Sequence, residues 1–271
     1  IDQMTFYNTV QEMGFKTTDD HNLPYSEGVG PMPLNNPNGI RWSTGICYVL
    51  PAMVRENLDV LSNSICKKIL IENGKQIGLI LENDEIYEGN EIIVSAGAVE
   101  SPKLLLLSGV GKKDELDESN IEHVHELKGV GQNLRDHPAV ELRWNGDHSL
   151  NDNLTDVGAQ KVGLRYTSSN SKDRLDMISV MRFQPEGISP DNLHFEKSDF
   201  GKTRVGITTG IFLAKSSGKL SLNKLDPRNH PDLNYNYLSN ENDFQRMIEG
   251  VKFNFEIARN SNFDSFRKDL I

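Results

Sequence analysis

In one short segment of the chain, an apolar run is followed by a turn of small residues and then by a leucine-rich run. This order predicts a strand buried on both faces at Ile92–Ser95 and a helix whose body is Leu104–Leu107. Ser101 suits the N-cap of that helix, Pro102 its first position and Gly109 its C-cap. Free N–H groups at the start of such a helix suit a dinucleotide, and an ordinary strand-to-helix connection is the alternative interpretation.

The chain before this segment is predicted to contain a helix, a long loop and hairpin-connected strands. Residues 1–13 have a short amphipathic helical pattern, with Met4, Val10 and Met13 at mixed three-residue spacings, and the helix is expected to end at Gly14. Residues 17–39 repeat Pro and Gly, which disfavours regular structure and predicts a long ordered loop or lid. Short β-type runs follow at 58–61, 65–71 and 77–81, with turn residues at 73–74 and 83–84.

After Pro138 the composition changes to apolar strand-like stretches that alternate with polar loops. This alternation predicts a mostly antiparallel sheet flanked by helices, so the fold class is α/β in the first part and α+β in the second. Residues 243–258 predict a closing helix with one apolar face. The strand-like stretches are 139–144, 177–183, 205–214 and 219–222, and the helix face consists of Phe244, Met247, Ile248, Val251 and Phe255.

Charge and cysteine content exclude several classes of protein. The 29 basic and 39 acidic residues give a formal net charge of −10, and no basic stretch occurs, so no nucleic-acid partner is expected. The longest aliphatic run, Leu104–Leu107, is far shorter than the roughly 20 residues of a membrane-spanning helix, so no membrane span is expected. Cys47 and Cys66 are too few for a disulfide framework or a structural zinc site, which favours a reducing, cytoplasmic location.

Other site motifs are weak or missing. His123 and His125 lie on one face of a predicted strand, but no third ligand is close in sequence, so no metal site is predicted. Gly129–Leu134 begins like a dinucleotide fingerprint but has Leu134 in place of the third glycine. The chain has no Gly-x-Ser-x-Gly elbow that would carry a hydrolase nucleophile.

Four motifs, in order along the chain, resemble the glucose-methanol-choline (GMC) family of FAD-dependent oxidoreductases. The small-residue turn, Ser-Pro, leucine-rich helix and Ser-Gly-Val-Gly of residues 95–111 closely match the family's second signature. Residues 129–137 are similar to its loop between the flavin and substrate domains. Residues 39–60 resemble the approach to its FAD-contacting strand, and residues 217–238 resemble a strand and turn of its substrate domain.

The resemblance implies contacts to an FAD cofactor. Cys66 stands where the family usually has a valine whose main chain meets the adenine, and cysteine keeps a similarly small side chain there. Ala96 and Gly97 would line the adenine and the ribose, while Ser101 would cap the adjacent helix. Cys66, Ala96, Gly97 and Ser101 are therefore the candidate cofactor-binding residues.

The resemblance also implies a division of the chain. Residues 1–39 correspond to a substrate-domain or lid segment, 40–137 to part of a Rossmann-like FAD-binding domain, and 138–271 to the substrate-binding domain. The family's Gly-x-Gly-x-x-Gly segment, which binds the FAD pyrophosphate, and its catalytic C-terminal histidine have no counterpart here. We therefore expect an internal fragment of the enzyme, with the catalytic histidine beyond Ile271. His137 belongs to the interdomain loop and is not expected to be a catalytic base.

The implied reaction is the oxidation of an alcohol to an aldehyde by hydride transfer to flavin N5. Residues 27–39 and 41–44 look most like choline-dehydrogenase-like and mycofactocin-associated members, so a small-molecule primary alcohol is the expected substrate. Oxygen, a quinone or another carrier would accept the electrons. Two alternatives stay open: a non-catalytic binding protein derived from the same fold, and a nicotinamide-dependent dehydrogenase, which the missing Gly-rich fingerprint disfavours.

Overall fold

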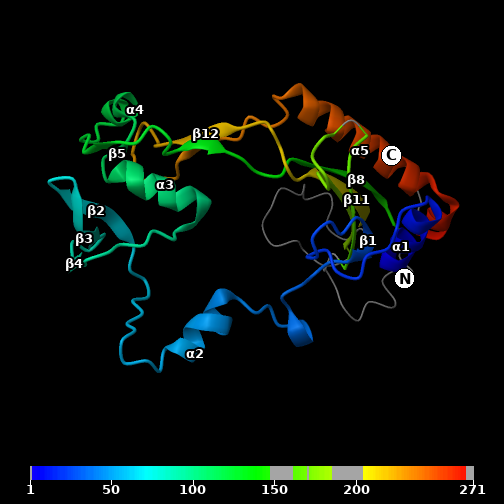
Figure 1. Cartoon of the computed structure of the whole chain (residues 1–271), viewed down its shortest axis with the longest axis horizontal. Coiled ribbons are helices and arrows are strands. Elements are labelled where there is room, and N and C mark those ends of the chain that lie inside the picture. The colour runs from blue at the N-terminus through cyan, green and yellow to red at the C-terminus, as the bar shows by residue number, and fades with distance from the viewer. Residues whose placement is uncertain (1, 147–160, 170, 185–203, 267–271) are drawn as a thin grey trace. The chain divides into compact units, whose positions relative to one another are not determined.

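The computed structural model describes residues 2–146, 161–169, 171–184 and 204–266 of the chain. Two compact units are formed (Figure 1). Unit 1 comprises Ile1–Arg41, Asp136–Lys215 and Leu238–Ile271, and unit 2 comprises Trp42–Arg135 and Ser216–Tyr237. Each unit thus combines segments that are distant in sequence, and residues 216–237 group with 42–135 rather than with the rest of 138–271.

Unit 1 is built on a five-stranded antiparallel sheet with the strand order β1-β9-β10-β11-β8. The register places Ile178 of the central strand β10 between Arg165 of β9 and Gly210 of β11. The antiparallel sheet predicted after Pro138 is therefore confirmed for the stretches at 139–144, 177–183 and 205–214, whereas 219–222 lies in a separate sheet of unit 2. The strands are β1 (Gly28–Pro31), β8 (Ala139–Asn145), β9 (Val162–Tyr166), β10 (Met177–Gln184) and β11 (Arg204–Ile211).

Strand β1 lies inside residues 17–39, for which the sequence predicts a loop without regular structure, and at β1 that prediction is wrong. The strand pairs with β9 at the edge of the sheet and has Pro31 as its last residue. An edge strand tolerates proline because one row of its backbone groups needs no partner strand. The remainder of the segment contains an isolated bridge from Thr17 to Val29 and one short 3-10 turn, η1 (Pro37–Gly39).

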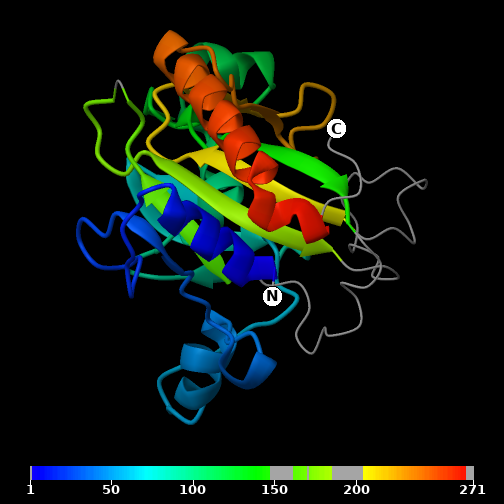
Figure 2. The same ribbon diagram turned by 90° about the vertical axis from the view of Figure 1, so that its right-hand side faces the viewer.

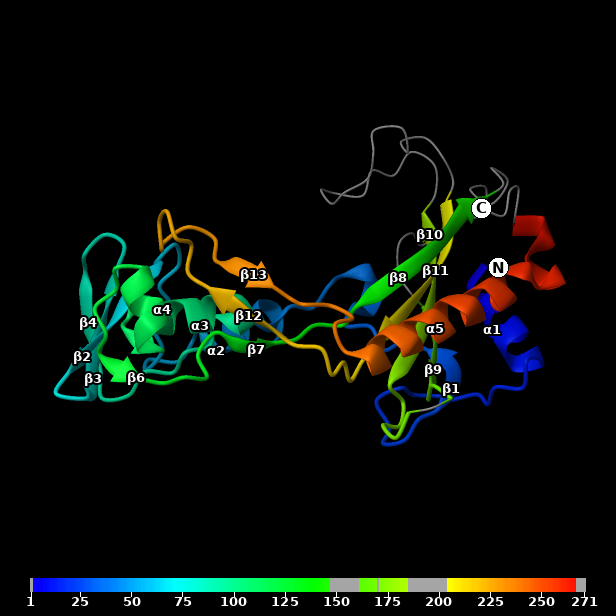
Figure 3. The same cartoon turned by 90° about the horizontal axis from the view of Figure 1, so that it is seen from above.

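Helices α1 (Asp2–Glu12) and α5 (Glu241–Arg259) lie beside each other on one face of this sheet (Figures 2 and 3). Helix α5 contacts β8, β10 and β11, whereas α1 contacts β1, β9 and β10. Phe6, Trp144 and Ile207 are among the fully buried side chains between helices and sheet. The predicted sheet with flanking helices is thus confirmed, and both of these helices pack on the same face.

The predicted apolar residues of the two helices are buried only in part. In α1, Val10 is fully buried together with Phe6, whereas Met4 is 53% exposed. In α5, Met247 is buried and Val251 packs against the core, whereas Phe244 is 45% exposed. The polar residues Asp243, Arg246 and Asn254 are buried instead, because polar groups of the sheet and its loops meet them there.

Unit 2 is assembled from three small sheets that contact helix α3 (Gly97–Leu107). Its first sheet is an antiparallel meander, and the predicted Asn73-Gly74 turn is confirmed by φ values of +52° and +75°. The strands are β2 (Cys66–Glu72), β3 (Lys75–Leu81), β4 (Ile86–Glu88), β5 (Val110–Gly111), β6 (His125–Glu126), β7 (Gln132–Leu134), β12 (Gly218–Ser221) and β13 (Asp232–Asn234), and the helical elements are η2 (Gly45–Val49), α2 (Leu50–Ala52) and α4 (Lys113–Glu118). In unit 1 a last turn, η5 (Ser261–Phe266), follows α5.

Two strands predicted in unit 2 do not form. Residues 58–61 and 92–95 are not assigned to any strand of the described part of the chain, and Ile93 is 80% exposed. A strand is defined by hydrogen bonds to a neighbour, and none of the described strands pairs with either segment. The prediction that Ile92–Ser95 is buried on both faces is therefore wrong for this structure.

Candidate functional site

Helix α3 begins at a turn of small, exposed residues. Ala96 is its N-cap residue and Gly97, with φ of +89°, is its first residue. A Cβ added to Gly97 would have no heavy atom within 4 Å, so the space beside this backbone is open. Ala96 has no side chain that can cap the helix, and the first N–H groups of α3 are left for a ligand or water.

Ser101 does not cap this helix, and that prediction is wrong. The helix starts four residues earlier, at Gly97, and runs through Ser101 and Pro102. Proline fixes φ near the helical value, so it can lie within a helix when the hydrogen bond lost is close to the N-terminus. The predicted end of the helix is confirmed, since Ser108 is the C-cap residue and Gly109 follows with φ of +78°.

Cys66 begins strand β2, opposite Leu81 of β3. Burial raises the pKa of its thiol, and a weak bond from Sγ to the backbone oxygen of Lys68, at 3.9 Å, opposes this only in part. The raised pKa keeps the thiol protonated at neutral pH, which makes it a poor nucleophile. Cys66 therefore has the character of a small, half-buried and uncharged side chain.

Ser108 joins the strand of Cys66 to the helix of Gly97. Its buried hydroxyl donates to the backbone oxygen of Leu104 at 2.7 Å and accepts the backbone N–H of Ile69 in β2 at 2.9 Å. Ser108 thus holds α3 against β2. The candidate cofactor residues Cys66 and Gly97, which begin these two elements, therefore belong to one unit. The sequence pattern does not indicate this role of Ser108, because a serine at a helix end is usually interpreted as a local cap.

Ser108→Ala should lower the free energy of unfolding by about 1–3 kcal/mol, since the buried N–H of Ile69 would lose its acceptor. Amide hydrogen exchange at Ile69 should accelerate, and urea unfolding should give the overall loss. Ser119→Ala is the matched control, because Ser119 is also buried but its hydroxyl only donates to the backbone oxygen of Glu115. Equal losses for the two variants would contradict the role given to Ser108.

Asp136 and His137 are the first two residues of the second segment of unit 1, and their side chains face different partners. Asp136 Oδ1 accepts the backbone N–H of His137 at 2.7 Å. The His137 ring instead packs against Phe212, with 4.6 Å between ring centroids. These contacts describe a packed loop and do not form a carboxylate–imidazole pair.

The sequence pattern places His123 and His125 on one face of a predicted strand, where they could supply two metal ligands. His125 lies in the short strand β6, whereas His123 precedes this strand. The Nε2 atom of His123 lies 3.2 Å from Oε2 of Glu126. No group of three or more His, Cys, Asp or Glu residues in the described ranges is arranged to hold a metal ion. The helices of those ranges also include none that is long and apolar enough to cross a membrane.

Comparison with protein families gives two matches on this chain. Residues 3–139 match the N-terminal model of the GMC oxidoreductases, and residues 214–269 match the C-terminal model. The first match spans half of the chain, including β2 and the whole of α3.

Individual proteins are similar over nearly the whole chain. An oxygen-dependent choline dehydrogenase of Photobacterium profundum is 30% identical over 98% of this chain and 50% of its own length. The mitochondrial choline dehydrogenase of Mus musculus is 32% identical over 97% of this chain and 47% of its own. The crystal structure of pyridoxine 4-oxidase from Mesorbium loti superposes with a TM-score of 0.82 at 18% identity, covering 99% of this chain and 53% of that protein. The chain thus spans about half the length of the relatives that it matches.

Proposed function

Since the chain belongs to the GMC oxidoreductase family, we propose that it contributes to the FAD-dependent oxidation of an alcohol to an aldehyde. The family resemblance and the fold class predicted from the sequence motifs are confirmed by these matches and by the superposition on a solved structure. The observation that carries the proposal is the open, uncapped start of α3 at Ala96 and Gly97, on a helix whose other end is bonded to β2 through Ser108.

The residues at this site fit the adenosine end of FAD. The open space beside Gly97 allows a flat ligand to approach the backbone, and the free N–H groups of α3 can donate to ligand oxygens. Cys66 would offer its main chain to the adenine, and its neutral thiol adds no charge. Ser101, inside the helix, is proposed as a neighbour of the cofactor and no longer as a cap. When bound, the flavin would supply the acceptor for the hydride.

We assign the segments to functions on the family's pattern. Residues 40–137 would bind FAD, residues 138–271 would bind the substrate, and residues 1–39 would act as a substrate-domain or lid segment, although 216–237 pack with the cofactor part. The substrate would be a small primary alcohol, and oxygen, a quinone or another carrier would accept the electrons. We place the protein in the cytoplasm because Cys47 and Cys66 are both free, while two of the relatives are named mitochondrial.

The proposal predicts that FAD uptake by the complete protein depends on the start of α3. Ala96→Glu should lower FAD affinity at least ~10-fold, because a carboxylate would occupy the open approach to the cofactor. An acidic residue near a helix N-terminus does not destabilise the helix, so the loss would not come from unfolding. Flavin absorbance of the purified protein and titration of the apoprotein with FAD measure the effect.

Ser64→Glu is the control, because Ser64 is also exposed and in unit 2, and the substitution adds the same charge. Unchanged FAD affinity in Ala96→Glu would overturn the assigned site while leaving the family intact. A complete protein that is colourless and takes up no FAD would instead favour a non-catalytic binding protein with the same fold.

A further inference from the structure

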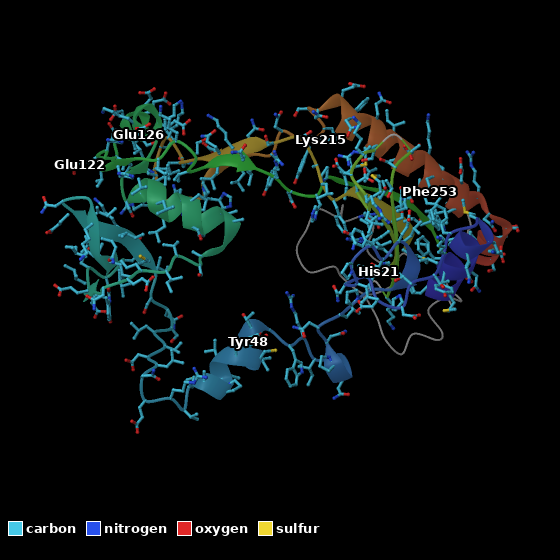
Figure 4. The ribbon with its side chains drawn as sticks, viewed as in Figure 1. His21, Tyr48, Glu122, Glu126, Lys215 and Phe253 are labelled. Carbon is cyan, nitrogen blue, oxygen red and sulfur yellow. The ribbon has the colours of Figure 1, made fainter. Side chains whose placement is uncertain are left out.

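One face of the sheet in unit 1 carries polar groups that the proposed cofactor site does not use. Leu164 and Tyr166 of β9 are buried in the core beneath the helices. Neighbouring side chains in a strand point to opposite faces, so Gly163 and Arg165 belong to the other face, which α1 and α5 do not cover. His21, from the segment before β1, lies close to β1 and β9 (Figure 4), where its ring contacts Gly30 and Gly163 and its backbone oxygen contacts Arg165.

His21 is held in place by the sheet backbone. Its Nε2 lies 3.3 Å from the backbone oxygen of Gly30 and 3.0 Å from that of Gly163, and both oxygens are acceptors, so Nε2 carries the proton. Gly30 and Gly163 are paired across β1 and β9, so the imidazole bridges two neighbouring strands. His21 is 5% exposed, and its Nδ1 has no partner in the described part of the chain.

One edge of the Arg165 guanidinium is held by a hydrogen bond, and the other edge is unpaired. Its Nη1 donates to the backbone oxygen of His21 at 3.1 Å, and its Cζ lies 5.5 Å from the centroid of the Phe212 ring. Nε is buried and bonded to no described residue, and no carboxylate of those residues pairs with this side chain. A guanidinium with unpaired N–H groups favours an anionic partner, because hydrogen bonds between two charged groups are the strong ones.

Several acidic groups of unit 1 are already engaged, including Asp20 beside His21, which accepts the backbone N–H of Asn22. Asp176 lies beside Phe212, whose N–H donates to the Asp176 backbone oxygen, but its carboxylate accepts bonds from Ser168 and Arg246. Asp136 accepts the backbone N–H of His137, whose ring covers Phe212. Glu141, on the same face of β8, is paired with Arg143. The positive charge of Arg165 is therefore not neutralised by these carboxylates.

We infer that Arg165, fixed by His21 and Phe212, binds a carboxylate group of a small-molecule ligand. A single guanidinium matches a monoanion better than a dianionic phosphate, which would need a second cation. The inference deepens the proposed function, on which it rests: the alcohol would be a hydroxy acid whose carboxylate is anchored on the sheet of unit 1. The Phe212 ring excludes water from one side of the guanidinium, which strengthens the pairing.

The test uses 4-(hydroxymethyl)benzoate and its neutral amide, which have nearly the same shape and differ in charge. In calorimetric titration of the full chain without FAD, the carboxylate should bind at least ~10-fold more tightly than the amide. In nitrogen-15 NMR, the Nε–H signal of Arg165 should shift on addition of the carboxylate and stay in place with the amide. Equal affinities, or no carboxylate binding, would overturn the inference without the use of any variant.

Arg165→Met should remove the preference for the carboxylate. Arg174→Met is the matched control, because Arg174 also lies over an aromatic ring, at 4.9 Å from the Tyr25 centroid, but belongs to the loop before β10. Retained preference in Arg165→Met would overturn the inference. Because binding is measured without flavin, failure of alcohol oxidation in the complete protein would count against the proposed function and leave this result standing.

Discussion

Arg246→Met should lower the free energy of unfolding of unit 1 by about 3–5 kcal/mol. Arg246 lies in the first half of α5 and is 3% exposed, and the carboxylates of Asp176 and Asp243 beside it are completely buried. The guanidinium donates to Asp176 at 2.7 Å and also to Asp243. Removing the cation would leave two buried carboxylates without their charge partner, which is the costliest way to break such a cluster.

The remaining hydrogen bonds cannot replace the cation. Asp176 also accepts the backbone N–H and the hydroxyl of Ser168, each at 2.9 Å. Asp243 accepts the backbone N–H of Lys215 at 2.9 Å. These donors fix the geometry of the carboxylates but are neutral, so the two negative charges would repel each other across the space left by the guanidinium. Urea unfolding of the wild type and the variant measures the loss.

Acidic pH provides an internal check on this prediction. Burial raises the pKa of Asp176, but the bonds from Arg246 and the neighbouring serines outweigh it and hold the pKa below its ordinary value. A depressed folded-state pKa gives stability that is present above the unfolded pKa, about 3.9, and is lost as the pH falls through the folded-state pKa. The difference between wild type and Arg246→Met should therefore narrow as the solution is acidified below about pH 4.

Arg259→Met is the control on the same helix. Arg259 is exposed in the last turn of α5 and lies over the ring of Phe255, at 5.7 Å from its centroid. Its removal should cost less than about 1 kcal/mol. A loss below about 1 kcal/mol for Arg246→Met as well would show that the buried cluster contributes little to the stability of unit 1.

The buried cluster also shows why the face of α5 could not be predicted from the sequence. The apolar pattern correctly indicates a helix there, and Met247 is buried as expected. The same pattern assigns Arg246 to solvent, because charged side chains are usually exposed. Its burial depends on Asp176, 70 positions earlier in the chain, and such long-range pairing leaves no periodic signal.

The candidate site was predicted in part. The signature around α3 correctly located the leucine helix, its glycine end and the small residues that open its start, since each depends on local backbone chemistry. Ser101 was misplaced as a cap because Gly97, free to take a positive φ, allows the helix to begin earlier. Strand formation at 92–95 depends on a neighbouring strand, which no local pattern specifies.

Gly109→Ala should destabilise unit 2 by about 2–5 kcal/mol, the combined cost of a left-handed alanine and of steric overlap. Gly109 has φ of +78°, and an added Cβ would lie 2.3 Å from the backbone oxygen of Glu122 and 2.7 Å from a methyl carbon of Val124. The backbone at Glu122 cannot withdraw freely, because the N–H of Val124 is bonded to the oxygen of Gly109 at 2.8 Å. Urea unfolding measures the loss, and faster exchange of the Val124 amide would locate it.

Gly74→Ala separates the cost of a left-handed alanine from the cost of steric overlap. Gly74 has φ of +75° in the same unit, but nothing lies within 4 Å of its added Cβ, so it should lose only the roughly 1–2 kcal/mol of the left-handed conformation. Equal losses in the two variants would show that the contact with Glu122 does not matter. If the contact does matter, the end of α3 shifts, and because the same rigid helix begins at Gly97, Gly109→Ala should also weaken FAD uptake in the complete protein while Gly74→Ala should not.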